Sequence, residues 1–202
     1  GRKRLHTHSG AMCWGGLSRT GAIAARLGLP DRAAYWNGLA DSIGETLLKR
    51  VWSEKRQAFT AAEDVDDMDA SVLLLPELGL IEPGDPRFAS TVAAIETDLV
   101  HGRHVMRYAS EDDFGLPETE FLVCRFWLID ALAALGRREE ARERYNDALS
   151  LRNSYGLLSE DIHPQTGALW GNFPQTYSMA GIILSAMRLS QSWEDRYWRA
   201  SS

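Results

Sequence analysis

Residues 121–150 read FLVCRFWLIDALAALGRREEARERYNDALS, two helical stretches of opposite character joined at Gly136. The stretch before Gly136 is apolar on nearly every side, which is typical of a helix that its neighbours bury. The stretch after it is charged and places Glu140 four residues before Arg144, a spacing that pairs the two on a solvated face. Because glycine commonly ends a helix, the two stretches predict a hairpin of one buried inner helix and one solvated outer helix.

The same alternation recurs along the whole chain. Apolar residues at every fourth position from Tyr35 to Val51 predict a buried stripe on an outer helix, which Pro30 opens. We predict inner helices at 9–29, 68–80, 117–135 and 175–190, and outer helices at 31–52, 86–101 and 138–152. Stacked hairpins of this kind build a solenoid or a closed ring, and the absence of a repeat with a fixed period favours the ring of an enzyme. The predicted fold class is all-α.

Composition is that of an ordinary globular domain. The chain has 202 residues, of which 45% are hydrophobic and 25% are charged, with a formal net charge of -6. This apolar content excludes disorder as the main state, and the acidic balance argues against nucleic acid and anionic membranes as partners. The basic run Arg2-Lys3-Arg4 is an exception that we interpret as a solvated end or loop. No apolar run approaches the roughly 20 residues that cross a bilayer.

Two features indicate a cytoplasmic chain. Cys13 and Cys124 lie far apart in apolar surroundings, which is typical of free buried thiols in a reducing compartment. The basic start of the chain runs into His-Thr-His-Ser at residues 6–9 instead of the apolar stretch of a signal peptide.

Three long connections each join an outer helix to the next inner one, and we expect them to emerge at the same end of the ring. They are residues 53–68, 101–116 and 153–174, and they combine acids with aromatic residues, glycine and proline. Carboxylates beside aromatic rings suit glycoside hydrolysis, in which one acid protonates the leaving oxygen, one carboxylate activates water and rings hold the sugar. Composition alone favours the simpler interpretation that these acids are solvated, because surface acids are the commonest kind.

Residues 156–178, GLLSEDIHPQTGALWGNFPQTYS, resemble a signature of bacterial glycoside hydrolase family 15, the glucoamylase family. Further blocks follow in the family's order: Thr7-His8-Ser9 with Met12-Cys13-Trp14, the run Asp67–Pro76, and Arg107-Tyr108 with Glu118–Phe121 and Cys124–Trp127. The resemblance covers Arg4 to about Leu189. It implies an (α/α)6 toroid of helical hairpins, of which this chain supplies about the second half.

The resemblance also implies a mechanism. Members of the family hydrolyse an α-glucosidic bond with inversion, through a general acid and a general base held about 6.5 to 9.5 Å apart. Glu160 occupies the place of the base, and the flanking Asp161 and His163 are candidates for tuning it electrostatically, or simply solvated residues. The acid belongs to a Trp-Glu-x-Arg-Gly type motif directly before the Thr-His-Ser block. We therefore expect residues 1–202 to be the C-terminal part of one catalytic domain, inactive without the upstream half.

The resemblance implies that six further residues bind substrate: Arg107, Glu120, Tyr177, Asp69, His8 and Trp170. Three of them have a plain structural alternative. Arg107 would otherwise form a salt bridge with Glu111 or Asp112 in its own loop. Tyr177 would pack in the core, and Asp69 would cap the helix that follows it, which is the commoner role for such an aspartate.

The expected partners follow from the same reasoning. The expected substrate is an α-linked glucose oligosaccharide or trehalose, and neither nucleic acid nor a membrane is expected. In a half toroid the inner helices 9–29 and 175–190 each lack one neighbour. We therefore expect the missing N-terminal half of the same polypeptide, or self-association, to cover their apolar sides.

No cofactor and no metal is predicted. The pairs His6-x-His8 and His101-x-x-His104 lack the spacing of a four-ligand zinc site. The sequence also lacks the Gly-x-Ser-x-Gly elbow of esterases and a phosphate-binding loop. The alternative to a glycosidase is a non-catalytic carbohydrate-binding or structural toroid, or an inactive fragment.

Overall fold

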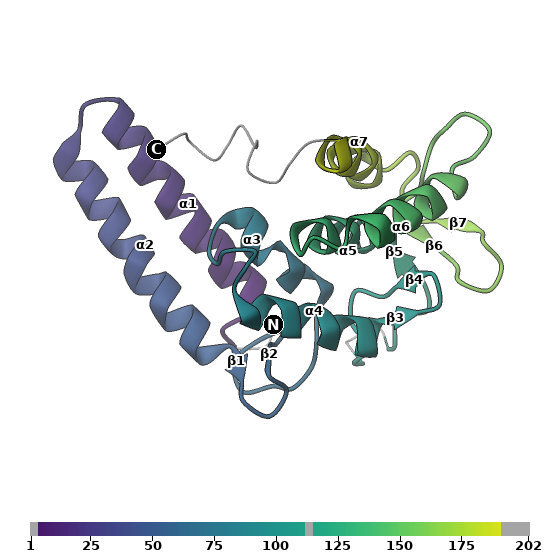
Figure 1. Ribbon diagram of the computed structural model, residues 1–202, viewed down its shortest axis with the longest axis horizontal. Helices are drawn as coiled ribbons and strands as arrows, with labels where there is room; N and C mark the ends of the chain where they lie inside the picture. Colours follow the sequence, from purple (N-terminus) through teal and green to yellow (C-terminus); the bar gives the residue numbers. More distant parts are fainter. Residues whose placement is uncertain (1–3, 112–114, 191–202) are drawn as a thin grey trace. The chain divides into compact units, whose positions relative to one another are not determined.

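The computed structural model of the protein describes residues 4–111 and 115–190 (Figure 1). Three of the residues named above lie outside this part: Arg2, Lys3 and Asp112. The described residues form seven α-helices, one 3-10 helix and seven strands of two residues each. None of these helices combines the length and the apolar character that a membrane span needs. The chain divides into two compact units at Ala94, inside a helix.

The first unit begins with a long helical hairpin. Helix α1 (Thr7–Arg26) and helix α2 (Pro30–Arg50) pack against each other along their length (Figure 1). Pro30 lies in the first turn of α2, as predicted, because its fixed φ suits that position. The predicted buried stripe of α2 is only partly confirmed, since Leu47 is buried but Tyr35 is 60% exposed. The reason is that α2 packs mainly against α1, which covers only part of the stripe.

The predicted inner helix 68–80 is not one continuous α-helix. It consists of a 3-10 helix, η1 (Ala70–Leu74), and a single α-helical turn, α3 (Leu75–Leu78). Pro76 contributes to the break, because proline has no N–H with which to continue the hydrogen bonds of the preceding helical turn. The segment is buried all the same, and Val72 is fully enclosed. Its inner character was therefore predicted correctly, and its helix type was wrong.

The first long connection contains a hairpin that was not predicted. Strand β1 (Trp52–Ser53) pairs antiparallel with strand β2 (Ala58–Phe59). The backbone N–H of Phe59 donates to the hydroxyl of Thr91 in helix α4 (Pro86–Leu99), with 3.0 Å between nitrogen and oxygen. The hairpin is thereby fastened to α4, and the Phe59 ring is fully buried.

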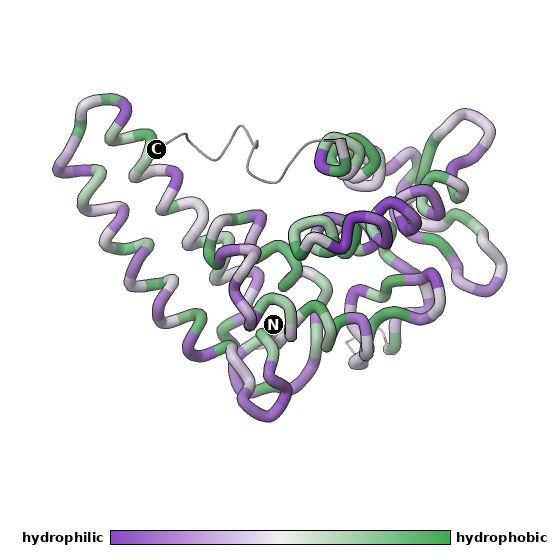
Figure 2. The backbone as a smooth tube through the Cα atoms, in the orientation of Figure 1, coloured by the Kyte–Doolittle hydropathy of each residue, from purple (hydrophilic) through white to green (hydrophobic). Residues whose placement is uncertain are grey.

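Helix α5 is the buried centre of the second unit. It spans Leu122–Ala134 and packs against α6 (Arg138–Ser150) and α7 (Thr176–Ser190). Figure 2 shows how hydrophilic α6 is, in agreement with its charged sequence. Gly136 follows α5 with a left-handed φ of 80°, a conformation that glycine adopts without a steric penalty. The predicted hairpin of an inner and an outer helix is confirmed here.

Five short strands lie in the connections of the second unit: β3 (Val100–His101), β4 (His104–Val105), β5 (Glu120–Phe121), β6 (Asp161–Ile162) and β7 (Leu169–Trp170). β3 and β4 form a hairpin, and β6 lies between β5 and β7 in an antiparallel sheet. The predicted helix start at residue 117 is corrected, because the chain pairs as β5 before α5 begins. Since β5 and β6 lie far apart in sequence, their pairing brings the second and third long connections together.

Helices α1 and α7 both expose apolar side chains. Met12 and Ile23 of α1 are 50% and 58% exposed, and Ile183 of α7 is 60% exposed. The expectation that both inner helices lack a neighbour on one side stays a prediction. The prediction of two buried thiols is half wrong, because Cys124 in α5 is buried and Cys13 on α1 is exposed.

Gly181 of α7 lies against the ring of Phe126 in α5, where an added Cβ would come within 2.4 Å of the ring carbon Cδ2. We expect Gly181→Ala to lower the free energy of unfolding by about 1–3 kcal/mol, because the buried ring must shift to admit a methyl group. Gly38→Ala on α2 is the control, because nothing lies within 4 Å of its Cβ position. Alanine there should stabilise by about 0.5–1 kcal/mol. Urea unfolding measures the free energy of unfolding of both variants. Equal changes in the two variants would contradict the tight contact of α5 with α7.

Candidate active site

A cavity of about 430 Å³ opens in the second unit where the second and third long connections meet. The residues that line it include Arg107, Tyr108, Thr119, Phe121, Glu160 and Asp161. It therefore holds two carboxylates and one guanidinium group, with aromatic rings beside them. Of the three connections predicted to emerge at one end, the second and third meet here, and Arg107 shares a site with Glu160. The place of the first connection stays a prediction.

The sheet of β5, β6 and β7 fixes the main chain at Glu160. This residue directly precedes β6, and its carbonyl accepts a hydrogen bond from the N–H of Leu122 at 3.0 Å. Its own N–H donates to the carbonyl of Asn172 at 2.9 Å. One bond leads to the start of α5 and the other to the segment after β7, so the main chain of Glu160 is held from two sides. A catalytic group needs support of this kind to keep its geometry.

The carboxylate of Glu160 is held through one oxygen. Its Oε2 accepts hydrogen bonds from the backbone N–H of Asn172 at 3.2 Å and from the side-chain amide of Asn172 at 3.0 Å. Among the residues that the structure describes, none donates to the other oxygen, Oε1. A carboxylate with one oxygen engaged and one open has the arrangement required to accept a proton from a water molecule.

Asp161 is the second carboxylate of the cavity and has different surroundings. Burial raises the pKa of Asp161 above its ordinary value, and the negative charges of Glu160 and Glu120 raise it further. The hydroxyl of Thr119 donates to Oδ2 of Asp161 at 2.6 Å and opposes that shift in part. The two neighbouring carboxylates therefore differ in what holds them: a pair of N–H donors for Glu160 and a hydroxyl for Asp161.

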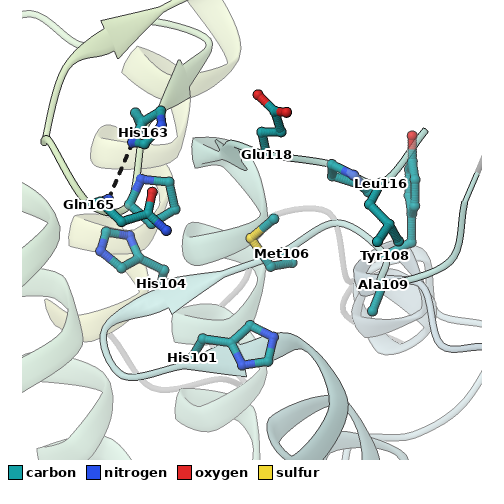
Figure 3. Close-up of a pocket in the computed structure, with 11 residues that line it drawn as sticks. His101, His104, Met106, Tyr108, Ala109, Leu116, Glu118, His163 and Gln165 are labelled. Carbon is teal, nitrogen blue, oxygen red and sulfur yellow. Dashed lines mark hydrogen bonds between the residues drawn. The ribbon is translucent and has the colours of Figure 1, made fainter. Parts of the chain in front are cut away.

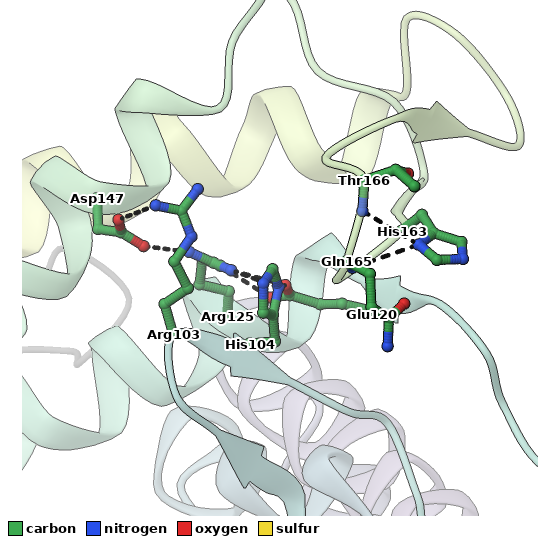
Figure 4. A network of polar contacts seen from close by, with 8 residues as sticks. All are labelled: Arg103, His104, Glu120, Arg125, Asp147, His163, Gln165 and Thr166. Carbon is green, nitrogen blue, oxygen red and sulfur yellow. Dashed lines mark hydrogen bonds and ion pairs between the residues drawn. The ribbon is translucent and has the colours of Figure 1, made fainter.

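Glu120 has a structural role that was not predicted. Its fully buried carboxylate accepts hydrogen bonds from Nε and Nη2 of Arg125 at 2.8 and 2.6 Å (Figure 4). Nδ1 of His104 lies 2.6 Å from Oε2 of the same carboxylate. Nη1 of Arg125 also donates a hydrogen bond to Oδ2 of Asp147 in α6, and Nη1 of Arg103 donates to Oδ1 of the same carboxylate. Both oxygens of Glu120 are engaged inside the protein, where they fasten β5 to α5 and β4. A contact of Glu120 with a sugar stays a prediction.

A second cavity, of about 670 Å³, lies beside the first and shares Tyr108, Leu116 and Pro117 with it. Figure 3 shows His101, His104 and His163 around this cavity. Nδ1 of His163 accepts a hydrogen bond from the N–H of Gln165 at 3.3 Å. Within the described ranges, no group of three or more His, Cys, Asp or Glu side chains is arranged to hold a metal ion.

Comparisons with known proteins assign the chain to a family. The family model described as glycosyl hydrolases family 15 matches residues 1–187. The chain belongs to this family. A trehalase of Thermoplasma acidophilum is 33% identical over 194 residues, which cover 96% of this chain and 33% of that protein. A trehalase of Mycobacterium tuberculosis is 33% identical over 198 residues, which cover 96% of this chain and 29% of that protein.

A solved structure shares the fold of this family 15 chain. A bacterial glucoamylase in complex with acarbose matches it with a TM-score of 0.75 and 15% identity, over 92% of this chain and 33% of that one. The predicted fold class, the all-α architecture of the glucoamylase toroid, is confirmed by this match and by the helices described above. The family 15 chain spans about a third of the length of the curated relatives named here.

Three other predicted substrate ligands of the family 15 chain lie in the second unit. The guanidinium carbon of Arg107 lies 5.6 Å from the ring centroid of Trp127. Trp170 of β7 is 49% exposed, and its ring lies 5.7 Å from that of His163, measured between centroids. Tyr177 at the start of α7 is 63% exposed, so the alternative of core packing is wrong for it. The rings of Trp170 and Tyr177 lie outside the lining of the cavity that holds Glu160.

The remaining two predicted ligands lie in the first unit. Asp69 precedes η1, and its Oδ1 accepts a hydrogen bond from the N–H of Ser71 at 2.8 Å. The alternative role of Asp69 as a helix cap is therefore confirmed. His8 lies in the first turn of α1 and is partly exposed. A direct contact of either residue with a sugar stays a prediction.

Asn172 and Thr119 contact the cavity's carboxylates and were not predicted to have a role. Asn172 lies within the signature segment, 12 residues after Glu160. No helical or strand period links positions so far apart, and the contact exists only because β6 and β7 pair across a turn. A prediction of that pairing from the sequence is the one signal that could have indicated Asn172.

We expect Asp161→Asn to change how stability depends on pH. Because the pKa of Asp161 is raised, the folded protein binds this proton more tightly than the unfolded chain does. Its contribution to stability is full below its ordinary pKa of 3.8 and is lost as the pH rises through the raised value. Asparagine cannot ionise and can still accept from Thr119, so the variant should gain stability over the wild type as the pH rises above 3.8 and through the raised pKa of Asp161.

Urea unfolding at a series of pH values tests this expectation. Asp41→Asn on the exposed face of α2 serves as the control, because that carboxylate lies outside the cavity. A parallel fall in the stability of wild type and Asp161→Asn across this pH range would contradict the role of burial at Asp161.

Proposed function

We propose that the protein containing this chain hydrolyses α-glucosidic bonds with inversion and releases glucose from the non-reducing end of an α-glucan or α-glucoside. In this proposal Glu160 is the general base. Membership of family 15 supports the reaction class. The observation that carries the choice of base is the position of Glu160 at the cavity, with Oε2 engaged and Oε1 open among the described residues.

The chemistry follows from that arrangement. Glu160 accepts a proton from water as the water oxygen bonds to the anomeric carbon from the face opposite the leaving group. The glycosidic C–O bond breaks, and its electron pair stays with the leaving oxygen, which takes a proton from a general acid. We propose that this acid lies outside the 202 residues of the chain, as the resemblance implies. On that basis the isolated chain is inactive.

Arg107 and the rings of Tyr108 and Phe121 are proposed to bind the sugar. All three line the cavity beside Glu160. A guanidinium group offers N–H donors in a fixed plane, which suits paired hydroxyl oxygens. Aromatic rings suit the apolar C–H faces of a sugar. The cavity thus combines what a glucose unit requires for binding with the group that activates water.

Trehalose is the first substrate to test. The curated relatives reported above are named trehalases, and each matches nearly the whole of this chain. These relatives support a glucoside as the substrate class to test. Activity against trehalose, maltose, maltotriose and isomaltose, measured in parallel, ranks the α-glucosides that the protein accepts.

The exposed apolar faces of α1 and α7 support a further part of the proposal. Ile23 and Ile183 are more than half exposed, and uncovered apolar patches of this kind mark contact surfaces. We propose that other sequence of the same polypeptide covers them, with self-association of the chain as the alternative. Light scattering of the 202-residue chain distinguishes a monomer from a larger assembly.

The assignment of the general base predicts the kinetics of Glu160→Gln. In the protein at the full length that its gene encodes, kcat should fall by about 10²-fold or more while KM changes little, since loss of general-base catalysis affects the transition state. Steady-state rates of glucose release measure both constants. A kcat near that of the wild type would overturn the assignment and would favour a non-catalytic sugar-binding role for this cavity.

Inversion predicts the anomer of the first product. Water added from the face opposite the leaving group turns an α-glucoside into β-glucose. Proton NMR in the first minutes of hydrolysis distinguishes the two anomers before they equilibrate. Maltotriose is the substrate for this test, because its leaving group is maltose and the released glucose comes only from the attacked unit. Initial release of α-glucose from maltotriose would contradict a single displacement by water and would indicate a covalent intermediate. With trehalose the leaving glucose keeps its α configuration, so inversion predicts equal initial amounts of α- and β-glucose.

A further inference from the structure

Asn172 and Glu160 are joined by three hydrogen bonds. The N–H of Glu160 donates to the carbonyl of Asn172 at 2.9 Å. In return, the N–H of Asn172 donates to Oε2 of Glu160 at 3.2 Å and its side-chain amide donates to the same oxygen at 3.0 Å. The first bond fixes one main chain against the other. The second and third fix the carboxylate itself, and one of them comes from a side chain that a substitution can remove.

Gly171 allows this close approach. Its φ is 74°, and a Cβ at this position would lie 2.9 Å from Oε2 and 3.0 Å from Cβ of Glu160. Any other residue would therefore press against the carboxylate, in addition to adopting an unfavourable left-handed conformation. Gly171 and Asn172 therefore lie against Oε2 of Glu160, on the side opposite the open Oε1.

The Asn172 side chain is not required for packing. Asn172 is exposed, and its described side-chain hydrogen bond goes to Glu160. Main-chain hydrogen bonds hold this segment, and they do not depend on the identity of residue 172. One of them runs from the N–H of Gln175 to the carbonyl of Leu158 at 3.0 Å. Removal of the side-chain amide should therefore affect the orientation of the carboxylate and leave the fold intact.

We propose that Asn172 is a positioning residue for the general base, which locks Oε2 of Glu160 so that Oε1 alone faces the attacking water. This inference rests on the proposed role of Glu160. A carboxylate held by two donors on one oxygen cannot rotate freely about its Cγ–Cδ bond, and its open oxygen stays at one place in the cavity. Preorganisation of this kind acts on the chemical step and not on the affinity for substrate.

The first test compares Asn172→Asp and Asn172→Ala in the full-length protein. Both remove the amide donor, and the aspartate is nearly isosteric with asparagine but places a second carboxylate against Oε2. We expect kcat to fall by about tenfold or more, a part of what general-base catalysis supplies, with KM within about twofold of wild type. The acidic limb of the kcat profile should move to higher pH in both variants, because the ionised base loses a hydrogen bond. The shift should be larger for aspartate, because its carboxylate also places a like charge beside the base.

Asn153→Asp is the matched control for these variants. Asn153 lies in the same long connection, and its Oδ1 accepts hydrogen bonds from the N–H groups of Tyr155 and Leu157, both at 3.0 Å. Aspartate retains those acceptors and adds the same charge outside the cavity. Its kcat, KM and pH profile should equal those of the wild type.

A glycine pair provides a second test that does not depend on residue 172. Gly167 has a φ of 69° with nothing within 4 Å of its Cβ position, so Gly167→Ala introduces left-handed strain alone. Gly171→Ala introduces similar strain and also a methyl group against Oε2. Thermal unfolding first checks that both variants are folded. We then expect kcat to fall in Gly171→Ala and to stay at the wild-type value in Gly167→Ala.

The outcomes separate this inference from the proposed function. If Glu160→Gln abolishes turnover while Asn172→Asp retains the kcat and the pH profile of the wild type, the positioning role is wrong and the base assignment stands. If Glu160→Gln keeps its activity, the base assignment fails first. A loss of kcat in folded Asn172 and Gly171 variants, with both controls unaffected, supports the positioning role.

Discussion

The buried ion pair between Glu120 and Arg125 is the interaction on which the candidate site depends. Glu120 lies in β5 and Arg125 in the first turn of α5, so the two hydrogen bonds between them lock a strand to the helix that follows it. Loss of one partner from such a buried pair leaves an uncompensated charge, at a cost of about 3–5 kcal/mol. His104 and Asp147 extend the same network to β4 and α6, which fixes β5 against three other elements.

The position of Glu160 follows from that of β5. β5 pairs with β6, directly after Glu160, and β6 pairs with β7, after which Gly171 and Asn172 return to the carboxylate. The three acidic residues have two different roles. Glu120 is buried and holds the sheet, whereas Glu160 and Asp161 line the cavity. The helices supply the rigid frame, and the connections supply the reactive groups, a common arrangement in enzymes.

The helices were predictable to different degrees. The hairpin of α5 and α6 was predicted because its apolar and charged patterns each persist for several turns, and periodic patterns of that length have one stable arrangement. The break at Pro76 and the exposure of Tyr35 were not predicted, because they depend on helix type and on which neighbour covers a face. Strands of two residues carry too short a pattern to be recognised.

The sequence by itself determined the inner character of α5, the outer character of α6 and the connection that holds Glu160. Hydrophobic periodicity and a contiguous signature are properties of residues close together in the chain, so both can be read without a structure. Only the tertiary structure decided that Glu120 is buried by Arg125, that Asp161 and Glu160 share one cavity, and that Asn172 holds Oε2. The role of a carboxylate depends on the group that faces it, and those groups come from distant positions that strand pairing brings together.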